Sequence, residues 1–160
     1  MLCRTVVLAA MTLLLAGCGV TESAACTQIA AQPGLAVTVE PGPARSITRL
    51  TLTVCSGNKC RTHQVRLAPG SDMVDQGCVG TDPDAACSAT AVPNQTSVGF
   101  VEIAGMTEGP LRVSGKATYG RRTSPLRQAS IVATMVHPNG AQCPGSAPQA
   151  SVAVTATGLR

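Results

Sequence analysis

Aromatic side chains are almost absent from this 160-residue sequence, which has one Phe, one Tyr and no Trp. Carbohydrate sites and the platforms on which nucleobases stack depend on aromatic faces. The net charge is a mild +4 at pH 7, and the Lys and Arg residues form no long run. The sequence therefore argues against carbohydrate and nucleic-acid partners. A core without aromatic rings must be built from Val, Leu, Ile, Ala and Thr, a composition that favours strands.

The common catalytic motifs are also missing, including Gly-x-Ser-x-Gly, a phosphate-binding loop and His-Glu-x-x-His. The two histidines, His63 and His137, are expected to be structural, the first at the edge of the core and the second in a turn. No pair of carboxylates is placed for acid–base chemistry. We therefore expect neither an enzyme nor a cofactor.

The N-terminal segment of the sequence has the features of a targeting signal. Arg4 supplies a positive charge, and an almost wholly apolar run follows from Thr5 to Leu15. This run is shorter than the roughly 20 apolar residues that a membrane-spanning helix needs. A charged start, a short apolar stretch and small residues at its end are typical of a secretory signal peptide, which we place at residues 1–17.

The junction Leu15-Ala16-Gly17-Cys18 resembles the lipobox of bacterial lipoproteins. The resemblance implies that the Cys18 thiol receives a diacylglycerol, that the chain is cut before Cys18, and that the new N-terminus is N-acylated with a fatty acid such as palmitate. One acyl chain binds a membrane only marginally, whereas two or more give a stable anchor. We expect a protein anchored to the extracytoplasmic face of the cell membrane, with residues 18–33 as its tether.

Six cysteines remain after Cys3 and Cys18 are set aside, and an even number in an exported chain implies disulfides rather than a metal site. The segments before Cys55 and after Cys60 alternate apolar and polar residues, with turn residues between them. Placing these cysteines opposite each other puts both apolar stripes on one face. We therefore expect a hairpin with a Cys55–Cys60 disulfide; a redox pair is the alternative.

Two further disulfides follow from loop closure and elimination. Cys78 and Cys87 enclose a short loop and are expected to pair with each other, which leaves Cys26 for Cys143. Residues 69–90 are expected to be a loop-rich connection. Four aspartates lie in this region, and calcium binding is an alternative to a solvated loop. They are Asp72, Asp75, Asp82 and Asp84.

Alternating segments predict about seven short strands and no convincing helix. The expected strands are residues 35–39, 48–54, 60–67, 98–103, 111–119, 128–136 and 149–157. Residues 120–125 are expected to form a basic loop, in which Arg121 and Arg122 could meet phosphate or lipid headgroups. This pattern indicates an all-β fold, an antiparallel β-sandwich of immunoglobulin-like type, over residues 34–160.

The mature chain resembles small actinobacterial lipoproteins of unassigned function. The likeness rests on residues 54–62, on residues 77–88 around the Cys78–Cys87 loop, and on His137-Pro138-Asn139-Gly140 before Cys143. It implies no activity. We expect a non-catalytic binding or scaffolding module of the cell envelope with a protein partner. The alternatives are a carrier or sensor for a small ligand or metal ion, and an envelope enzyme, which would need a cleft of convergent polar groups.

Overall fold

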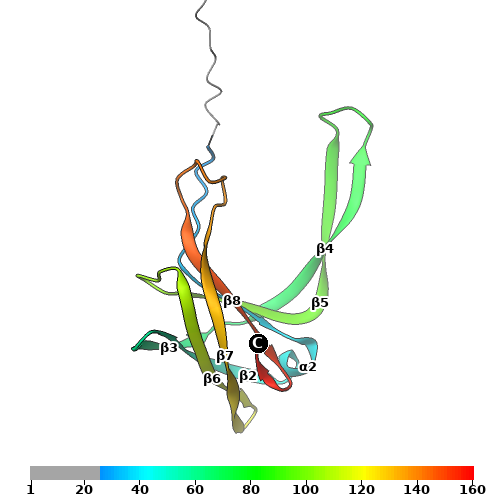
Figure 1. Cartoon of the computed structure of the whole chain (residues 1–160). Helices are drawn as coiled ribbons and strands as arrows, with labels where there is room; N and C mark the ends of the chain where they lie inside the picture. The colour runs from blue at the N-terminus through cyan, green and yellow to red at the C-terminus, as the bar shows by residue number, and fades with distance from the viewer. Residues whose placement is uncertain (1–25) are drawn as a thin grey trace, which may run out of the picture.

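The computed structural model describes residues 26–160, so the expected signal peptide and Cys18 lie outside the described residues. This part of the chain forms nine strands and one short helix (Figure 1). Their bounds are β1 Gly34–Val39, α2 Pro41–Ala44, β2 Ile47–Ser56, β3 Lys59–Val65, β4 Ala68–Val79, β5 Ala86–Glu102, β6 Gly109–Tyr119, β7 Arg122–Val136, β8 Ala147–Thr155 and β9 Gly158–Leu159. The fold is all-β, as the sequence predicts, with nine strands instead of about seven.

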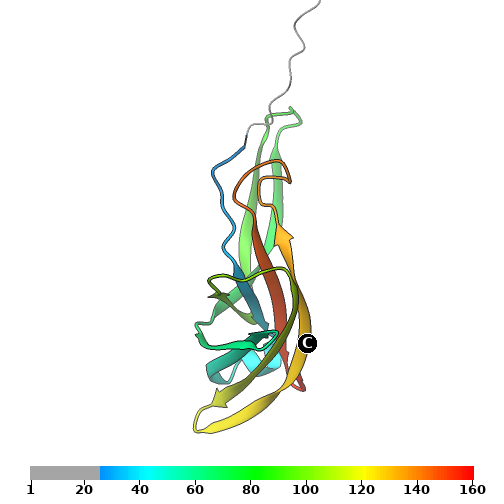
Figure 2. The same cartoon turned by 60° about the vertical axis from the view of Figure 1, so that its left-hand side comes forward.

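All the strands belong to one mixed sheet with the order β3-β2-β6-β7-β8-β1-β5-β4, and β9 pairs with β8. Strands β1 and β8 run parallel, and the other pairs are antiparallel. Strand β7 joins the two halves of the sheet, because its residues 122–133 pair with β6 and residues 134–136 pair with β8. Figure 2 shows β7 as a long curved strand. The sheet therefore folds over along β7 into two halves that this strand connects.

The core consists of aliphatic side chains that both halves of the sheet contribute. Its buried members contain no aromatic residue, as the composition requires. They are Leu35, Val37, Val39, Leu50, Leu52, Val54, Val65, Val101, Leu111, Val113, Ala117, Ala129, Ala133, Ala150, Val152, Val154 and Leu159. Every second residue is buried along residues 35–39 of β1, 50–54 of β2 and 150–154 of β8, which is the period of a strand with one face on the core.

The β2–β3 hairpin has the register that the sequence predicts. Cys55 lies opposite Cys60, Leu52 opposite His63 and Leu50 opposite Val65. Leu50, Leu52 and Val65 are buried on the shared face. The register is fixed because a shift of one residue would turn the apolar stripe of one strand away from the face that its partner buries.

Three disulfides connect the cysteine pairs that the sequence favours. Cys55–Cys60 and Cys78–Cys87 each join neighbouring strands of a hairpin, with Cα–Cα distances of 4.0 and 3.9 Å. Cys26–Cys143 joins positions 117 residues apart and holds the start of the described chain against the loop between β7 and β8. The Cys26–Cys143 disulfide therefore connects the tether to the loop between β7 and β8.

Two segments that were expected to be loops are strands. Residues 69–90, expected to be a loop-rich connection, contain most of β4 and the start of β5, which pair from Ala68↔Val98 to Val79↔Ala86. The expected basic loop at residues 120–125 is largely the start of β7, since the β6–β7 ladder continues to Tyr119↔Arg122. Both stretches are exposed on both faces, except for buried Gly70 and half-buried Ala85. They therefore lack the alternation of apolar and polar residues by which a half-buried strand is recognised.

Candidate functional site

The β4–β5 hairpin extends beyond the sheet that packs on the core. Strand β5 pairs with β1 only from Ser97 to Glu102. Residues 70–96, called the arm below, therefore form a two-stranded ribbon. Figures 1 and 2 show the arm projecting from the body toward the same side as residues 26–33.

A polar joint holds the arm where it leaves the body. The side-chain amide of Asn94 donates to Oδ1 of Asp72 at 2.7 Å, and Oδ1 of Asn94 accepts from the hydroxyl of Thr96 at 2.7 Å. Gln95, between them, has a φ of 65°, a left-handed conformation that is uncommon for a residue with a side chain. Its side chain also accepts a hydrogen bond from Arg45 in the segment after α2. These contacts fix the direction in which the arm leaves the sheet.

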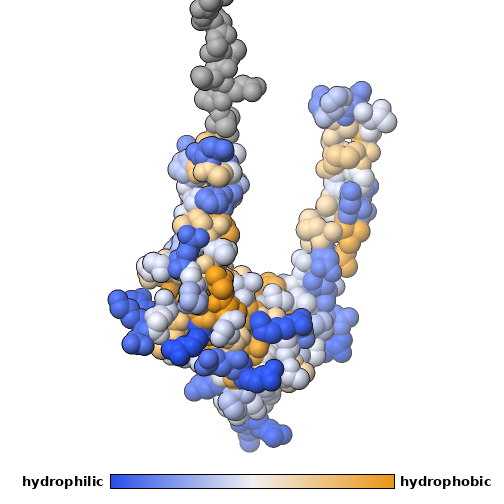
Figure 3. Space-filling view, viewed as in Figure 1, coloured by the Kyte–Doolittle hydropathy of each residue, from blue (hydrophilic) through white to orange (hydrophobic). Residues whose placement is uncertain are grey.

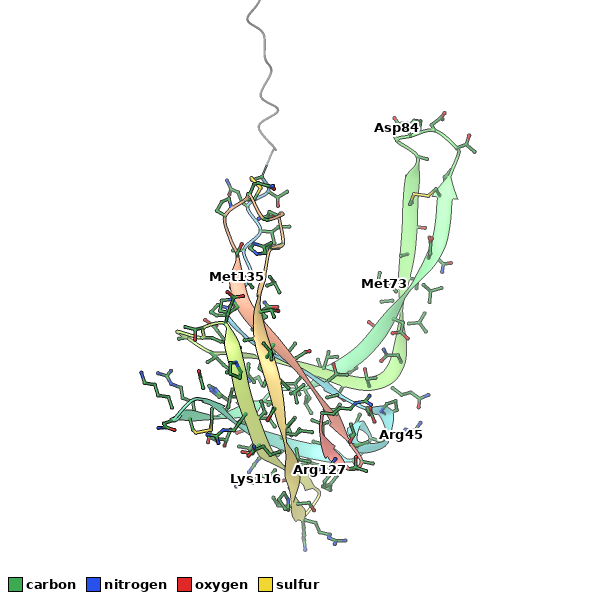
Figure 4. All side chains as sticks on the ribbon, viewed as in Figure 1. Arg45, Met73, Asp84, Lys116, Arg127 and Met135 are labelled. Atoms are coloured by element: carbon green, nitrogen blue, oxygen red, sulfur yellow. A yellow bond between two sulfur atoms is a disulfide. The ribbon has the colours of Figure 1, made fainter. Side chains whose placement is uncertain are left out.

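Farther out, the ladder and one disulfide hold the arm together. A two-stranded hairpin is marginally stable in water, so a crosslink near its end contributes a large share of its order. Cys78 and Cys87 are directly opposite in the ladder and are bonded. Figure 4 shows this disulfide close to the tip, below Asp84. The arm is a stapled ribbon, meaning a two-stranded hairpin that a disulfide crosslinks near its tip.

The surface of the arm combines exposed apolar side chains with acidic ones. Met73 is 68% exposed and Val79 is 86% exposed, and Val74 and Val92 are also exposed. Figure 3 shows apolar patches along the arm alternating with hydrophilic residues, which also cover its tip. The arm carries four aspartates and no Lys or Arg; the aspartates are Asp72, Asp75, Asp82 and Asp84. The arm therefore exposes apolar and acidic side chains side by side, a combination that makes it a candidate interaction surface.

Both outer edges of the arm are open in the part of the chain that the structure describes. Strand β4 pairs only with β5, and residues 86–96 of β5 pair only with β4. An unpaired strand edge presents a row of backbone N–H and C=O groups that another strand can meet. The arm thus offers backbone hydrogen-bonding groups, apolar side chains and negative charge together.

A second candidate site is a cavity of about 360 Å³ between β2, β3 and the segment after β5. Buried Val54 and Leu111 line it together with Met106, and exposed Lys59 and Arg61 lie at its wall. Apolar lining with a few placed polar groups is the usual make-up of a small-molecule site. The two cations would suit a ligand with an apolar body and an anionic group.

The remaining residues singled out by the sequence lie apart from both features. His63 faces the core opposite Leu52, which fits the expected position at the core edge; its Nε2 is buried and has no hydrogen-bond partner among residues 26–160, whereas a structural histidine there normally has one. Nδ1 of His137 lies 2.7 Å from the hydroxyl of Ser146 within the β7–β8 loop. Arg121 and Arg122 are exposed at the β6–β7 turn. The structure brings neither histidine to the arm.

The four aspartates of the arm do not gather into a cation site. Within residues 26–160, no three His, Cys, Asp or Glu side chains form a group that could hold a metal ion. Oδ1 of Asp72 accepts a hydrogen bond from the side-chain amide of Asn94. Oδ1 of Asp75 accepts one from the backbone N–H of Gly77 at 2.7 Å. These carboxylates therefore serve the conformation and the charge of the arm.

No helix in residues 26–160 has the length and hydropathy needed to cross a membrane. Comparison of the chain with protein-family models, with curated proteins and with solved structures finds no match. The geometry of the arm and of the cavity therefore carries the functional argument by itself.

Proposed function

We propose that this chain is a lipid-anchored binding or scaffolding module of the cell envelope, that it is non-catalytic, and that the arm is its contact element. The observation that carries the proposal is the arm itself. It is a stapled ribbon with two open edges and exposed Met73, Val74, Val79 and Val92. An open strand edge is a template for pairing with another chain, and the exposed apolar side chains beside it would add to such a contact.

The anchor and the fold type belong to the same proposal. Lipidation of Cys18 is supported by the lipobox resemblance of Leu15-Ala16-Gly17-Cys18 and by disulfides that suit export. An immunoglobulin-like sandwich is supported by the largely antiparallel pairing and by the single core shared by both halves of the sheet. The extracytoplasmic face of the cell membrane is the proposed location.

Site-specific photocrosslinking in living cells tests the role of the arm. A photoreactive amino acid replaces Met73 on the arm or, as a matched control, Val132 on β7, which is also well exposed at 61%. We expect discrete crosslinked species from position 73 and much weaker ones from position 132. Equal crosslinking from both positions, or none from position 73, would contradict the proposal.

A carrier or sensor of a small anionic amphiphile is the second candidate function. The observation that favours it is the cavity beside Lys59 and Arg61, with Met106 and Leu111 in its lining. Mass spectrometry of the denatured, purified protein tests it. A released amphiphile in stoichiometric amount, lost in a variant with Met106→Glu in the half-buried lining that still folds, would support the carrier function over the scaffold.

A further inference from the structure

The charges of the chain are divided between two regions. Residues 67–111 contain six of the eight acidic residues and none of the twelve Lys and Arg residues. The rest of the described chain, residues 26–66 and 112–160, holds eleven Lys and Arg residues and a single acidic one, Glu40. One molecule therefore presents an acidic arm and a basic body.

The two edge strands of the sheet repeat this division. β3 and β4 stand at opposite ends of the strand order, and in the described chain neither has a partner on its outer side. β3 carries Lys59 and Arg61, both exposed, whereas β4 carries the exposed Asp72 and Asp75. Charged edges normally prevent sheets from joining, because two like edges repel each other. Edges of opposite charge do not have this protection against each other.

We propose that the open edge of β4 in the arm pairs with the open edge of β3 in a second copy of this chain. The inference rests on the proposed function, since it names the partner of the arm. Backbone groups along both edges would supply the hydrogen bonds, and the opposite charges would select this pairing. Pairing of two arms, or of two β3 edges, is disfavoured because like charges would face each other.

The body also offers a place for the apolar side chains of the arm. The cavity of about 360 Å³ that contains Lys59 and Arg61 in its wall has Val54, Met106 and Leu111 as apolar lining. The arm brings exposed Met73 and Val74 beside its aspartates. Each copy has one arm and one β3 edge, so the contact is heterologous and can extend to more than two copies.

Reciprocal charge reversal in the full-length chain tests this pairing. The arm variant carries Asp75→Lys on the β4 edge itself, together with Asp82→Lys and Asp84→Lys at the end of the arm; among described residues the Asp75 side chain has a local hydrogen bond from the backbone of Gly77. The edge variant carries Lys59→Glu and Arg61→Glu. Two differently tagged copies are co-expressed, solubilised from membranes in mild detergent, and one tag is captured while the other is measured.

We expect the native chain to capture its differently tagged copy. This capture should fall on the order of tenfold in either variant, because like charges then meet at the contact. Co-expression of the arm variant with the edge variant should restore much of the capture, since opposite charges meet again. Capture should also fall at about 1 M salt, where the screening length is about 3 Å. Intact disulfides and an unchanged Tm in both variants establish that they fold.

Self-capture that is absent in the native chain, or that neither variant reduces, overturns the pairing. The photocrosslinks from position 73 then show whether the proposed function fails as well. Crosslinks to a different protein would leave the arm as a contact element and remove only the second copy as its partner. The absence of any crosslink would overturn both.

Discussion

Gly70 occupies a position that no other residue type can take without moving the joint of the arm. A Cβ added there would lie 2.0 Å from Oγ1 of Thr96 and 2.9 Å from Oδ1 of Asn94. These are the atoms that hydrogen-bond each other beside the left-handed Gln95. A close approach of backbone to side chain is a common reason for glycine within a strand. At the residue scale, the direction of the arm thus depends on a small set of polar contacts.

We expect Gly70→Ala to lower the free energy of unfolding by about 1–3 kcal/mol, because the added methyl group overpacks the joint. Thermal or denaturant unfolding measures this change. Gly42→Ala in α2 is the matched control, since an added Cβ there meets nothing within 4 Å. Equal effects of the two substitutions would show that the joint is not as tightly packed as described.

At the element scale, the arm is a ribbon that the body supports only at the joint. Its strands are exposed on both faces, and only the ladder, the joint and the Cys78–Cys87 disulfide hold it. The β2–β3 hairpin has a similar disulfide at its end, but β2 is also paired with β6 and buries Leu50 and Leu52. The disulfide should therefore contribute more to local stability in the arm than the corresponding disulfide does in the β2–β3 hairpin.

Replacing both Cys78 and Cys87 with Ser should let the arm fray while the body stays folded, because an isolated hairpin is marginal. Hydrogen exchange of the backbone amides in residues 71–93 measures this. We expect at least about tenfold faster exchange there, equivalent to roughly 1.4 kcal/mol of lost local stability. The Cys55→Ser and Cys60→Ser pair is the control and should leave exchange in β2 nearly unchanged. Similar loss of protection in both variants would contradict this view of the arm.

The same difference explains which elements the sequence predicts. The β2–β3 register follows from alternating residues, turn residues and two cysteines because one face of that hairpin is buried. The arm has no buried face, so residues 69–90 lack the alternation that predicts a strand, and their four aspartates favour a solvated loop. A usable signal was present in the absence of Lys and Arg from residue 67 to residue 111. Composition alone, however, does not show that this acidic segment projects from the body as a ribbon.

At the scale of the whole molecule, the arm lies on the same side of the body as the start of the described chain, which follows the proposed anchor (Figure 1). The Cys26–Cys143 disulfide ties the tether to the domain, and the arm extends to the same side as residues 26–33 (Figure 1). A module held at a membrane surface by its N-terminus would therefore present the arm close to that surface. Contacts made by the arm would then be favoured by the high local concentration of other anchored proteins.

We expect Cys18→Ala to release the protein from the membrane fraction, because no acyl chain can then be attached. Cell fractionation followed by immunodetection measures the distribution. Cys3→Ala is the matched control, since it also removes a cysteine from the N-terminal region but lies within the expected signal peptide. Retention of the Cys18→Ala chain in the membrane fraction would show that something else holds it there.

Shortening the arm shows whether the arm is the contact element. A variant in which a two-residue Asn-Gly turn replaces residues 72–92 keeps the whole core and the disulfides Cys55–Cys60 and Cys26–Cys143. Neighbours of the native and the shortened chain are compared by crosslinking in intact cells. We predict that the shortened chain remains at the membrane and loses the dominant crosslinked species of the native chain. Persistence of that species in the shortened, folded chain would mean that the arm is not the contact element.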